Sequence, residues 1–324
     1  MQDVAKLAGV SLVTVSRVVN EPDKVSAQTL AAVKAAIREL GYVPNLTAGS
    51  LASNRSRIVA AIVPTIANSI FAQTIDGLAN TLARQGYQLL LGQSNYHVDE
   101  ESRLIDVFLG RRVDGLVLTG ALHADGVRER LRANSMPVVE TWDLPAQPID
   151  MAVGFSNDDA GAAIAHYLIG KGFQRLAFVG GYEDRSNKRL NGFRRAAAAL
   201  GVAAVDIEQV PAPVSMEAAA NAFGRILSRN PGVRAVFCSN DMLASGVLFE
   251  CARRALKVPD QIAVMGFADL PIASLIQPNL SSVRVRSEEI GTRAAQMLLD
   301  RFAGLQPIAS PIDLGFTIVG RASA

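Results

Sequence analysis

The pattern of hydrophobic positions along the chain changes near residue 58. Beyond it, short continuous apolar runs alternate with longer stretches in which apolar residues recur every three or four positions. Continuous runs predict strands that are buried on both faces, and the periodic stretches predict helices that cover parallel sheets. The predicted strands form two sets, residues 58–63, 89–91, 115–118 and 138–139, then 176–179, 235–237 and 262–265. The predicted helices include residues 72–85, 158–171, 191–200 and 242–256.

Two sets of strands and helices predict two doubly wound subdomains. Ligands of such folds bind outside the carboxyl ends of the strands, so we expect a ligand cleft there. A chain of 324 residues has room for both subdomains and a smaller N-terminal domain.

The N-terminal region has shorter helical segments. Its apolar positions fall on one face of each segment: 4, 7 and 8 in the first, 15, 18 and 19 in the second, and 30, 33, 37 and 40 in a third, about residues 26–40. Gly9 suits the left-handed residue that ends the first helix, and Ser11 suits the N-cap of the second. Two short helices joined by so tight a turn predict a helix-turn-helix.

The exposed side of the second helix and the local charge both favour DNA. The inward valines leave Leu12, Val13, Ser16 and Arg17 on the open side. Residues 1–57 contain seven Lys or Arg against four Asp or Glu, a formal excess of three positive charges where phosphates would be met. The alternative is a small helical domain that binds protein.

The segment after the third helix resembles a short helix that is unstable alone. Pro44 ends the third helix, and Asn45 can cap a new one. Gly49 costs a helix about 1 kcal/mol relative to alanine, so a helix that forms only on DNA fits this sequence. Leu51 would then be an apolar wedge between base steps in the minor groove. A plain flexible linker is the alternative.

Composition narrows the class of protein. No run approaches the ~18–20 apolar residues that cross a bilayer, and no basic-then-apolar leader opens the chain, so we expect a cytoplasmic protein with no membrane partner. Cys238 and Cys251 lack a CxxC pattern and read as reduced core thiols, with a disulfide as the alternative.

We expect no cofactor, metal or catalytic set. Gly180-Gly181 lacks the third glycine and the spacing of a dinucleotide fingerprint. His97, His123 and His166 lie far apart with no ligand spacing, and there is no Gly-x-Ser-x-Gly elbow.

The N-terminal motifs resemble the headpiece of LacI/GalR-family repressors. They are VAKLAGVS (4–11), TVSRVVN (14–20) and GYVPN (41–45), and further stretches are RLNGF (189–193), AVFCSND (235–241) and VPDQIAVMGF (258–267). The resemblance implies an α plus α/β protein: a three-helix headpiece (1–44), a hinge helix (45–57) and a core like periplasmic binding proteins (58–324). One subdomain would hold 58–154 plus 286–311 and the other 155–284 plus 312–324, with three crossings between them. Family members usually carry several residues before the segment that matches Gln2, so we expect the start to be misassigned or trimmed.

The resemblance also assigns DNA-binding residues. In the family the hinge becomes helical on the operator, and a leucine at the position of Leu51 opens the central base step. Leu12 and Val13 depart from the polar residues often found there; they can touch thymine methyl groups but cannot hydrogen-bond to bases. The implied DNA-binding residues are Ser11, Leu12, Val13, Thr14, Ser16, Arg17, Asn20, Asn45 and Leu51.

For the effector, the resemblance implies bulky walls and two polar contacts. Arg189 stands where a cation meets ligand oxygens, and Asn240 matches a polar residue that hydrogen-bonds the effector. The remaining implied residues are Ile70, Phe71, Phe155, Glu140 and Trp142. The apolar ones could equally be core, and Arg189 could be a surface ion pair.

One departure from the family favours an acid as effector. Many sugar-responsive members have an aspartate after Gly266-Phe267, and this chain has Ala268. Removing a carboxylate near Arg189 favours an anionic ligand, which a bidentate arginine would orient. The segments ETWD (140–143), FCSND (237–241) and LGF (314–316) resemble gluconate-operon repressors of the family. Gluconate, a ketogluconate or a phosphorylated relative is the effector we expect.

We therefore expect a homodimeric repressor that binds a pseudo-palindromic operator and is controlled by a sugar acid. The sequence leaves open whether the effector induces or co-represses. Two rival hypotheses are a cytoplasmic sugar or sugar-acid binding protein with a non-functional headpiece, and a sugar-acid-processing enzyme.

Overall fold

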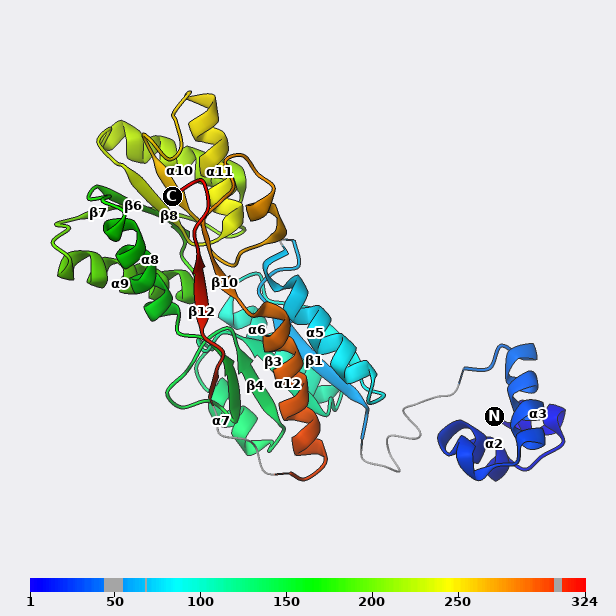
Figure 1. Ribbon diagram of the computed structural model, residues 1–324. Helices are drawn as coiled ribbons and strands as arrows, with labels where there is room; N and C mark the ends of the chain where they lie inside the picture. Colours follow the sequence, from blue (N-terminus) through cyan, green and yellow to red (C-terminus); the bar gives the residue numbers. More distant parts are fainter. Residues whose placement is uncertain (44–54, 68, 306–310) are drawn as a thin grey trace. The chain divides into compact units, whose positions relative to one another are not determined.

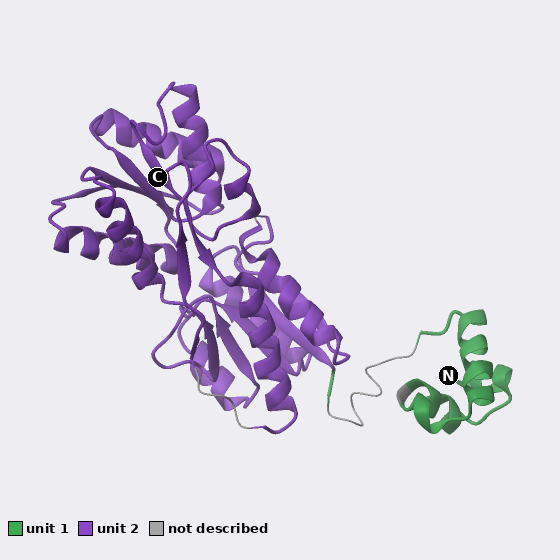
Figure 2. Cartoon of the chain, in the orientation of Figure 1, with its two compact units in different colours: residues 1–56 green, residues 57–324 purple. Residues whose placement is uncertain are grey.

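The computed structural model describes residues 1–43, 55–67, 69–305 and 311–324. The chain divides into two compact units, residues 1–56 and 57–324 (Figure 2). The second unit therefore begins at Arg57, one residue before the core expected from the sequence. Most of the expected hinge helix, residues 45–57, lies outside the described residues.

The described part of the first unit, residues 1–43 and 55–56, contains three α-helices and one short 3-10 helix. They are α1 (Gln2–Ala8), α2 (Leu12–Asn20), η1 (Pro22–Lys24) and α3 (Ala27–Glu39). Gly9 has a φ of 64° and ends α1, and the hydroxyl of Ser11 caps α2 by accepting from the backbone N–H of Thr14 at 3.2 Å. The predicted helix-turn-helix and its third helix are confirmed.

The core of this unit is small and follows the predicted pattern in part. Its buried members are Val4, Ala5, Val15, Val18, Val33 and Ala36, while Val19 is only half-buried. Leu7 and Leu40, which were expected on the apolar faces, are 46% and 45% exposed. Helices α1, α2 and α3 pack around one point, which leaves the opposite side of α2 open.

Within residues 57–67, 69–305 and 311–324, the second unit contains two parallel sheets and one antiparallel strand pair (Figure 1). The first sheet has the order β11-β5-β4-β3-β1-β2, from β1 (Ile58–Val63), β2 (Gln88–Gln93), β3 (Gly115–Thr119), β4 (Val138–Thr141), β5 (Met151–Gly154) and β11 (Ile312–Asp313). The second has the order β7-β6-β8-β9, from β6 (Leu176–Gly181), β7 (Val205–Val210), β8 (Ala235–Cys238) and β9 (Ala263–Met265). The antiparallel pair is β10 (Ser282–Val285) and β12 (Phe316–Val319).

Helices cover both faces of each sheet. The first subdomain contains η2 (Ser69–Phe71), α5 (Ala72–Ala83), α6 (Val98–Gly110), α7 (Val127–Ala133) and α12 (Ser287–Phe302). The second contains α8 (Asn157–Gly170), α9 (Asp184–Ala199), α10 (Met216–Arg229), α11 (Asp241–Arg253) and η3 (Pro271–Ser274). Helices α5 and α12 share one apolar layer, and α6 and α7 form the layer on the other face of the first sheet. The two doubly wound subdomains are confirmed.

Several elements differ from the sequence prediction. Strands β5, β7, β10, β11 and β12 were not among the predicted strands. Strand β5 has only four residues, and β7 is an edge strand whose half-buried residues include Asp206, Glu208 and Gln209. Helix α9 begins at Asp184, although the sequence predicted a start at residue 191. The prediction missed its first two turns because they are charged and carry no apolar periodicity. The other expected helices begin and end within three residues of the observed bounds.

The chain passes between the subdomains after β5, through β10 and through β12. The expected assignment of residues 312–324 to the second subdomain needs one correction. Ile312 and Asp313 pair with Val153 and Gly154, so they extend the first sheet, and the tail reaches the second subdomain only through β12. There Ser323 donates its hydroxyl to the carbonyl of Val264 at 2.6 Å.

The largest apolar cluster includes buried residues from both subdomains. Cys238 and Cys251 are free and buried, as expected; burial raises the pKa of the Cys251 thiol to about 12 and also raises the pKa of Cys238. In the described part of the chain, no helix is long and apolar enough to cross a membrane.

Candidate functional site

The open side of α2 carries the side chains expected to meet DNA. Val13 is 65% exposed and Leu12 is 44% exposed, and Arg17 lies one turn further along on the same open side. The hydroxyls of Ser11 and Thr14 lie 2.9 Å apart at the start of the helix, and Ser16 is half-buried. The side chain of Asn20, and all of Asn45 and Leu51, lie outside the described residues.

Leu12 and Val13 expose their apolar side chains at the start of α2. Their exposure leaves the N-terminal end of α2 able to present methyl groups and one guanidinium to a surface. A recognition helix uses its N-terminal residues in this way in the major groove.

A second candidate site lies where the carboxyl ends of strands from both sheets meet. The strand order of each sheet reverses at one point, between β1 and β3 and between β6 and β8, and such switch points are where doubly wound sheets bind ligands. A cavity of about 170 Å³ lies there. It is lined from the first subdomain by residues such as Pro64, Ser94, Glu101 and Thr119, and from the second by Tyr182, Glu183 and Arg185.

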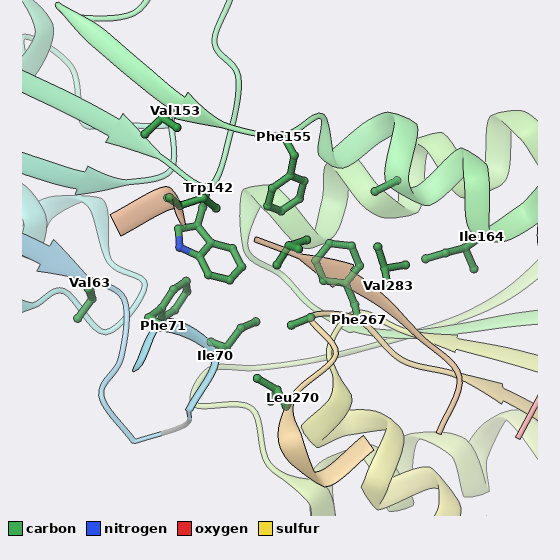
Figure 3. Packing of buried hydrophobic residues seen from close by; sticks show 14 of the residues in the cluster. Val63, Ile70, Phe71, Trp142, Val153, Phe155, Ile164, Phe267, Leu270 and Val283 are labelled. Carbon is green, nitrogen blue, oxygen red and sulfur yellow. The ribbon is translucent and has the colours of Figure 1, made fainter. Parts of the chain in front are cut away.

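A row of buried aromatic rings lies among residues of both subdomains (Figure 3), and the ring of Phe71 is 5.5 Å from the guanidinium of Arg185, which lines the cavity. The ring of Trp142 makes edge contacts with Phe71 at 5.1 Å and with Phe155 at 5.9 Å, and Phe155 lies 5.8 Å from Phe267. The indole Nε1 of Trp142 donates to Thr74 Oγ1 at 3.1 Å, which fixes the ring. Three of the expected wall residues therefore form one continuous stack, and Ile70 is buried against it.

Arg189 lies at one end of the aromatic row. Its guanidinium is centred 4.3 Å from the ring of Phe267, and Nη1 donates to Asn157 Oδ1 at 2.6 Å. Its Nη2 lies 3.9 Å from the Glu183 carboxylate. Burial is the main cause that lowers the pKa of Arg189 to about 10; the positive charge of Arg185 acts in the same direction and the carboxylate of Glu183 opposes it. Arg189 is therefore a buried cation and not a surface ion pair.

Arg185 lies at the other end of the row, and sequence reasoning missed it. Its guanidinium is 5.5 Å from the ring of Phe71, and Nη1 donates across the cleft to the carbonyl of Thr119 at 3.0 Å. Gly120 permits this approach: its φ is 104°, and a Cβ there would lie 2.6 Å from Arg185 Nη1. The spacing of four residues from Arg189 was the available signal, because it places both side chains on one face of α9.

Glu183 is the carboxylate that these two arginines share. Burial raises its pKa, and the charges of Arg189 and Arg185 oppose that rise. Two other acids near α9 are paired with Lys188: Asp143 across the cleft, and Asp184 at 2.9 Å. Asp269, the residue after Ala268, instead pairs with Arg284 at 2.8 Å and with Arg321 at 2.7 Å.

Among the buried polar atoms that have no hydrogen-bond partner in the described part of the chain, three lie on α9 or at the carboxyl end of β8. They are Arg189 Nε, Ser186 Oγ and Ser239 Oγ. Ser186 and Arg189 lie one turn apart on α9, and Ser239 follows β8 beside Gly180, whose Cβ would lie 2.6 Å from Ser186 Oγ. Buried polar atoms without partners are costly, so this cluster favours a polar ligand at the end of β6 and β8.

Asn240 lies at the same strand ends. It is the N-cap of α11, where its Oδ1 accepts from the backbone N–H of Leu243 at 2.9 Å. This bond uses one of the two lone pairs of the oxygen, and the cap does not engage the amide nitrogen, which can meet an effector.

The expectation that Glu140 lines the cleft is wrong in this structure. Side chains alternate along β4, so Val139 faces the layer of α5 and α12 while Glu140 faces the layer of α6 and α7. Its carboxylate lies 3.0 Å from Arg128 Nη2 and 3.2 Å from His123 Nε2, and it accepts from the backbone N–H of Ile149 at 2.5 Å.

Comparison with known proteins identifies both units. Residues 1–45 match bacterial regulatory proteins of the lacI family, and residues 165–324 match a periplasmic binding protein-like domain. The chain is 40% identical to the HTH-type transcriptional regulator GntR of Pseudomonas aeruginosa, over 100% of this chain and 95% of that one.

Solved structures agree. A LacI-family regulator from Silicibacter pomeroyi has a TM-score of 0.92 at 31% identity, covering 99% of this chain and 98% of that one. The transcription regulator GntR from Chromobacterium violaceum has a TM-score of 0.78 at 35% identity, covering 82% of this chain and 98% of that one.

Proposed function

The chain belongs to the LacI family of bacterial regulatory proteins and is a ligand-responsive transcriptional regulator, not an enzyme, and we propose that its effector is gluconate or a closely related sugar acid. The curated relatives named GntR support this choice, as does the resemblance of residues 140–143, 237–241 and 314–316 to gluconate-operon repressors. The observation that carries the proposal is the pair of buried arginines on α9.

Arg185 and Arg189 give the cleft an anion-binding end. Both guanidiniums are buried and share Glu183 as their acidic neighbour, because Asp143 and Asp184 are engaged by Lys188 and Asp269 by two other arginines. A carboxylate bound by two guanidiniums forms charge-assisted hydrogen bonds that a neutral sugar lacks. The pair therefore favours an acid.

The rest of a sugar acid suits the same site. Its hydroxyls can pair with Ser186 Oγ and Ser239 Oγ, which have no partner in the described part of the chain, and with the amide nitrogen of Asn240. Its carbon chain can lie against the aromatic row of Phe71, Trp142, Phe155 and Phe267. Apolar walls with a few convergent polar groups are typical of small-molecule sites.

Effector binding can act on DNA through contacts that join the subdomains. Arg185 bonds to the Thr119 carbonyl and Lys188 to Asp143, and both pairs join α9 to the first subdomain. A ligand carboxylate that draws Arg185 away from Thr119 breaks one of these contacts. The arrangement of the subdomains that contains the contact then loses stability relative to an arrangement that lacks it. In a homodimer on a pseudo-palindromic operator, this difference becomes a difference in DNA affinity, and DNA must weaken effector binding by the same factor.

The test is fluorescence anisotropy on the duplex upstream of the chain's own gene, titrated with gluconate and then with 2- and 5-ketogluconate. We expect the protein to bind the duplex tightly and in a salt-dependent way, and one of these acids to release it. The reason is that the effector binds and stabilises the subdomain arrangement that fits the operator poorly. Specific DNA binding that no sugar acid alters would reject the effector but keep the regulator. Gluconate binding without any specific DNA binding would favour a sugar-acid binding protein instead.

A further inference from the structure

A buried charged cluster in the first subdomain has no role in anion binding by α9. His123 Nδ1 lies 2.6 Å from Glu101 Oε1, and His123 Nε2 lies 3.2 Å from Glu140 Oε1. Arg128 from α7 completes the cluster through its contact with Glu140. Glu101, on the first turn of α6, lines the same cavity as Arg185.

Charged groups line the cavity from both subdomains: Arg185 with Glu183 and Asp184 from the second, and Glu101 from the first. Arg185 reaches it from α9 of the second subdomain, with Arg189 one turn further along that helix. Glu101 reaches it from the first subdomain, beside Ser94 and Thr119. A sugar acid bound with its carboxylate at the arginines would direct its hydroxyl tail toward the first subdomain, where a carboxylate accepts hydrogen bonds from hydroxyl groups.

We infer that Glu101 makes the cleft reject sugar acids that carry a second anionic group at the far end of the chain, such as a 6-phosphate. The inference rests on the proposed function, since it takes the carboxylate of a sugar acid to lie at Arg185 and Arg189. A phosphate near the Glu101 carboxylate meets like charge, and such an element gives specificity by repulsion.

His123 is a positioning residue in this arrangement. Its ring is almost fully buried between Glu101 and Glu140, and these two carboxylates together with Arg128 are the charged groups that face it from α6, β4 and α7. Burial lowers the pKa of His123, but the two carboxylates outweigh that effect and raise it to about 9. A protonated ring donates from both nitrogens, so it holds the Glu101 carboxylate in place at the cavity wall.

The single tryptophan of the chain, Trp142, provides the readout, because it lies in the aromatic row beside the cleft. Its fluorescence is titrated with gluconate and with 6-phosphogluconate in the unmodified protein, in Glu101→Gln and in Asp106→Asn. Asp106 is an exposed acid on the same helix and serves as the matched control. We expect the unmodified protein and the control to prefer gluconate by about a hundredfold, and Glu101→Gln to reduce this preference about tenfold, as expected for removing one like charge.

A gain in 6-phosphogluconate affinity is a result that general damage to the fold would not produce. Equal binding of both acids by the unmodified protein, or an unchanged preference in Glu101→Gln, would overturn the inference while leaving gluconate as the effector. Failure of the unmodified protein to bind gluconate would instead reject the proposed function, and the inference with it.

A second measurement needs no variant and covers the case in which Glu101→Gln does not fold. Glucarate carries a carboxylate at both ends of the same hydroxylated chain, so the unmodified protein should bind it far more weakly than gluconate. Glucarate binding as tight as that of gluconate would contradict a repulsive carboxylate at the far end.

Discussion

Helix α2 of the first unit and helix α9 of the second present their functional side chains in opposite ways. Helix α2 exposes Leu12, Val13 and Arg17, and its buried valines only hold it in place. Helix α9 buries Arg185, Ser186 and Arg189 among residues from both subdomains. The DNA-facing side chains of α2 are therefore hydrated in the free protein and are desolvated only when DNA binds. The effector-facing side chains of α9 are already desolvated in the folded protein.

The largest effect should follow from removing a buried cation of α9. Arg189→Gln should weaken gluconate binding about a thousandfold, or about 4 kcal/mol, because the ligand carboxylate would be left buried beside Glu183 without its partner. Operator binding should be unchanged, since Arg189 lies in the second unit. Calorimetry for gluconate and anisotropy for DNA measure the two quantities.

Arg194→Gln is the matched control for this variant. Arg194 lies on the same helix but is exposed, so its loss should alter gluconate affinity less than twofold or so. Equal losses of gluconate affinity in both variants would show that the burial of Arg189 does not determine its contribution to gluconate binding.

The next effect is a dependence of stability on pH that only the second unit should show. His123 has its pKa raised from 6.5 to about 9, so the folded state binds a proton more tightly than the unfolded state. Its contribution is fully present below pH 6.5 and is lost as the pH rises through about 9. By linkage, the loss in free energy of unfolding should approach about 3 kcal/mol over that window.

Chemical denaturation at pH 6 and pH 9.5 measures this difference. His123→Gln should be less stable than the unmodified protein at pH 6 and should lose little more by pH 9.5, while His166→Gln, at an exposed histidine of α8, should keep the full dependence. Residues 1–57 contain no histidine, so headpiece unfolding should not share it. The same slope in His123→Gln would assign the pH dependence to other groups.

A smaller effect is expected from the exposed side of α2. Arg17→Ala should weaken operator binding by about 1–3 kcal/mol and relax the preference for operator over random duplex, if its guanidinium meets a base edge. Arg38→Ala removes the same charge from the exposed side of α3 and should weaken both duplexes alike. Gluconate affinity of the free protein should not change in either variant. Equal losses on both duplexes in Arg17→Ala would limit this residue to phosphate contact.

The contrast between α2 and α9 also explains what the sequence could predict. The headpiece was predictable because its caps, its left-handed Gly9 and its apolar spacing are local signals, and the strands of the core because they are continuous apolar runs. Strand β7 and the first turns of α9 were missed because they are polar and stabilised by partners distant in sequence. Glu140 was misplaced for a related reason: Trp142 two residues later lies in the aromatic row, but only the pairing of β4 decides which face each residue takes.

The site of the second unit was only partly predictable for the same reason. Arg189 could be assigned from the family resemblance, but Arg185 acquires its role from the Thr119 carbonyl and the Phe71 ring, which are 66 and 114 residues away in the sequence. Glu101 likewise depends on His123. A buried polar group is defined by partners from several elements, and no local pattern encodes them.

The smallest effect isolates the contact that holds Arg185 in place. Gly120→Ala adds a Cβ at a φ of 104° and 2.6 Å from Arg185 Nη1, whereas Gly201→Ala adds one at a φ of 85° with nothing within 4 Å. Both variants should lose about 1 kcal/mol of stability from backbone strain, a few degrees in Tm. Only Gly120→Ala should also displace Arg185 from Thr119, because the long side chain can yield where the backbone cannot. Its gluconate affinity should then change while that of Gly201→Ala stays constant, and the direction of the change tells whether the bond to Thr119 opposes the effector or prepares the site for it. Equal gluconate affinities in the two variants would mean that the hydrogen bond from Arg185 to the Thr119 carbonyl does not affect gluconate binding.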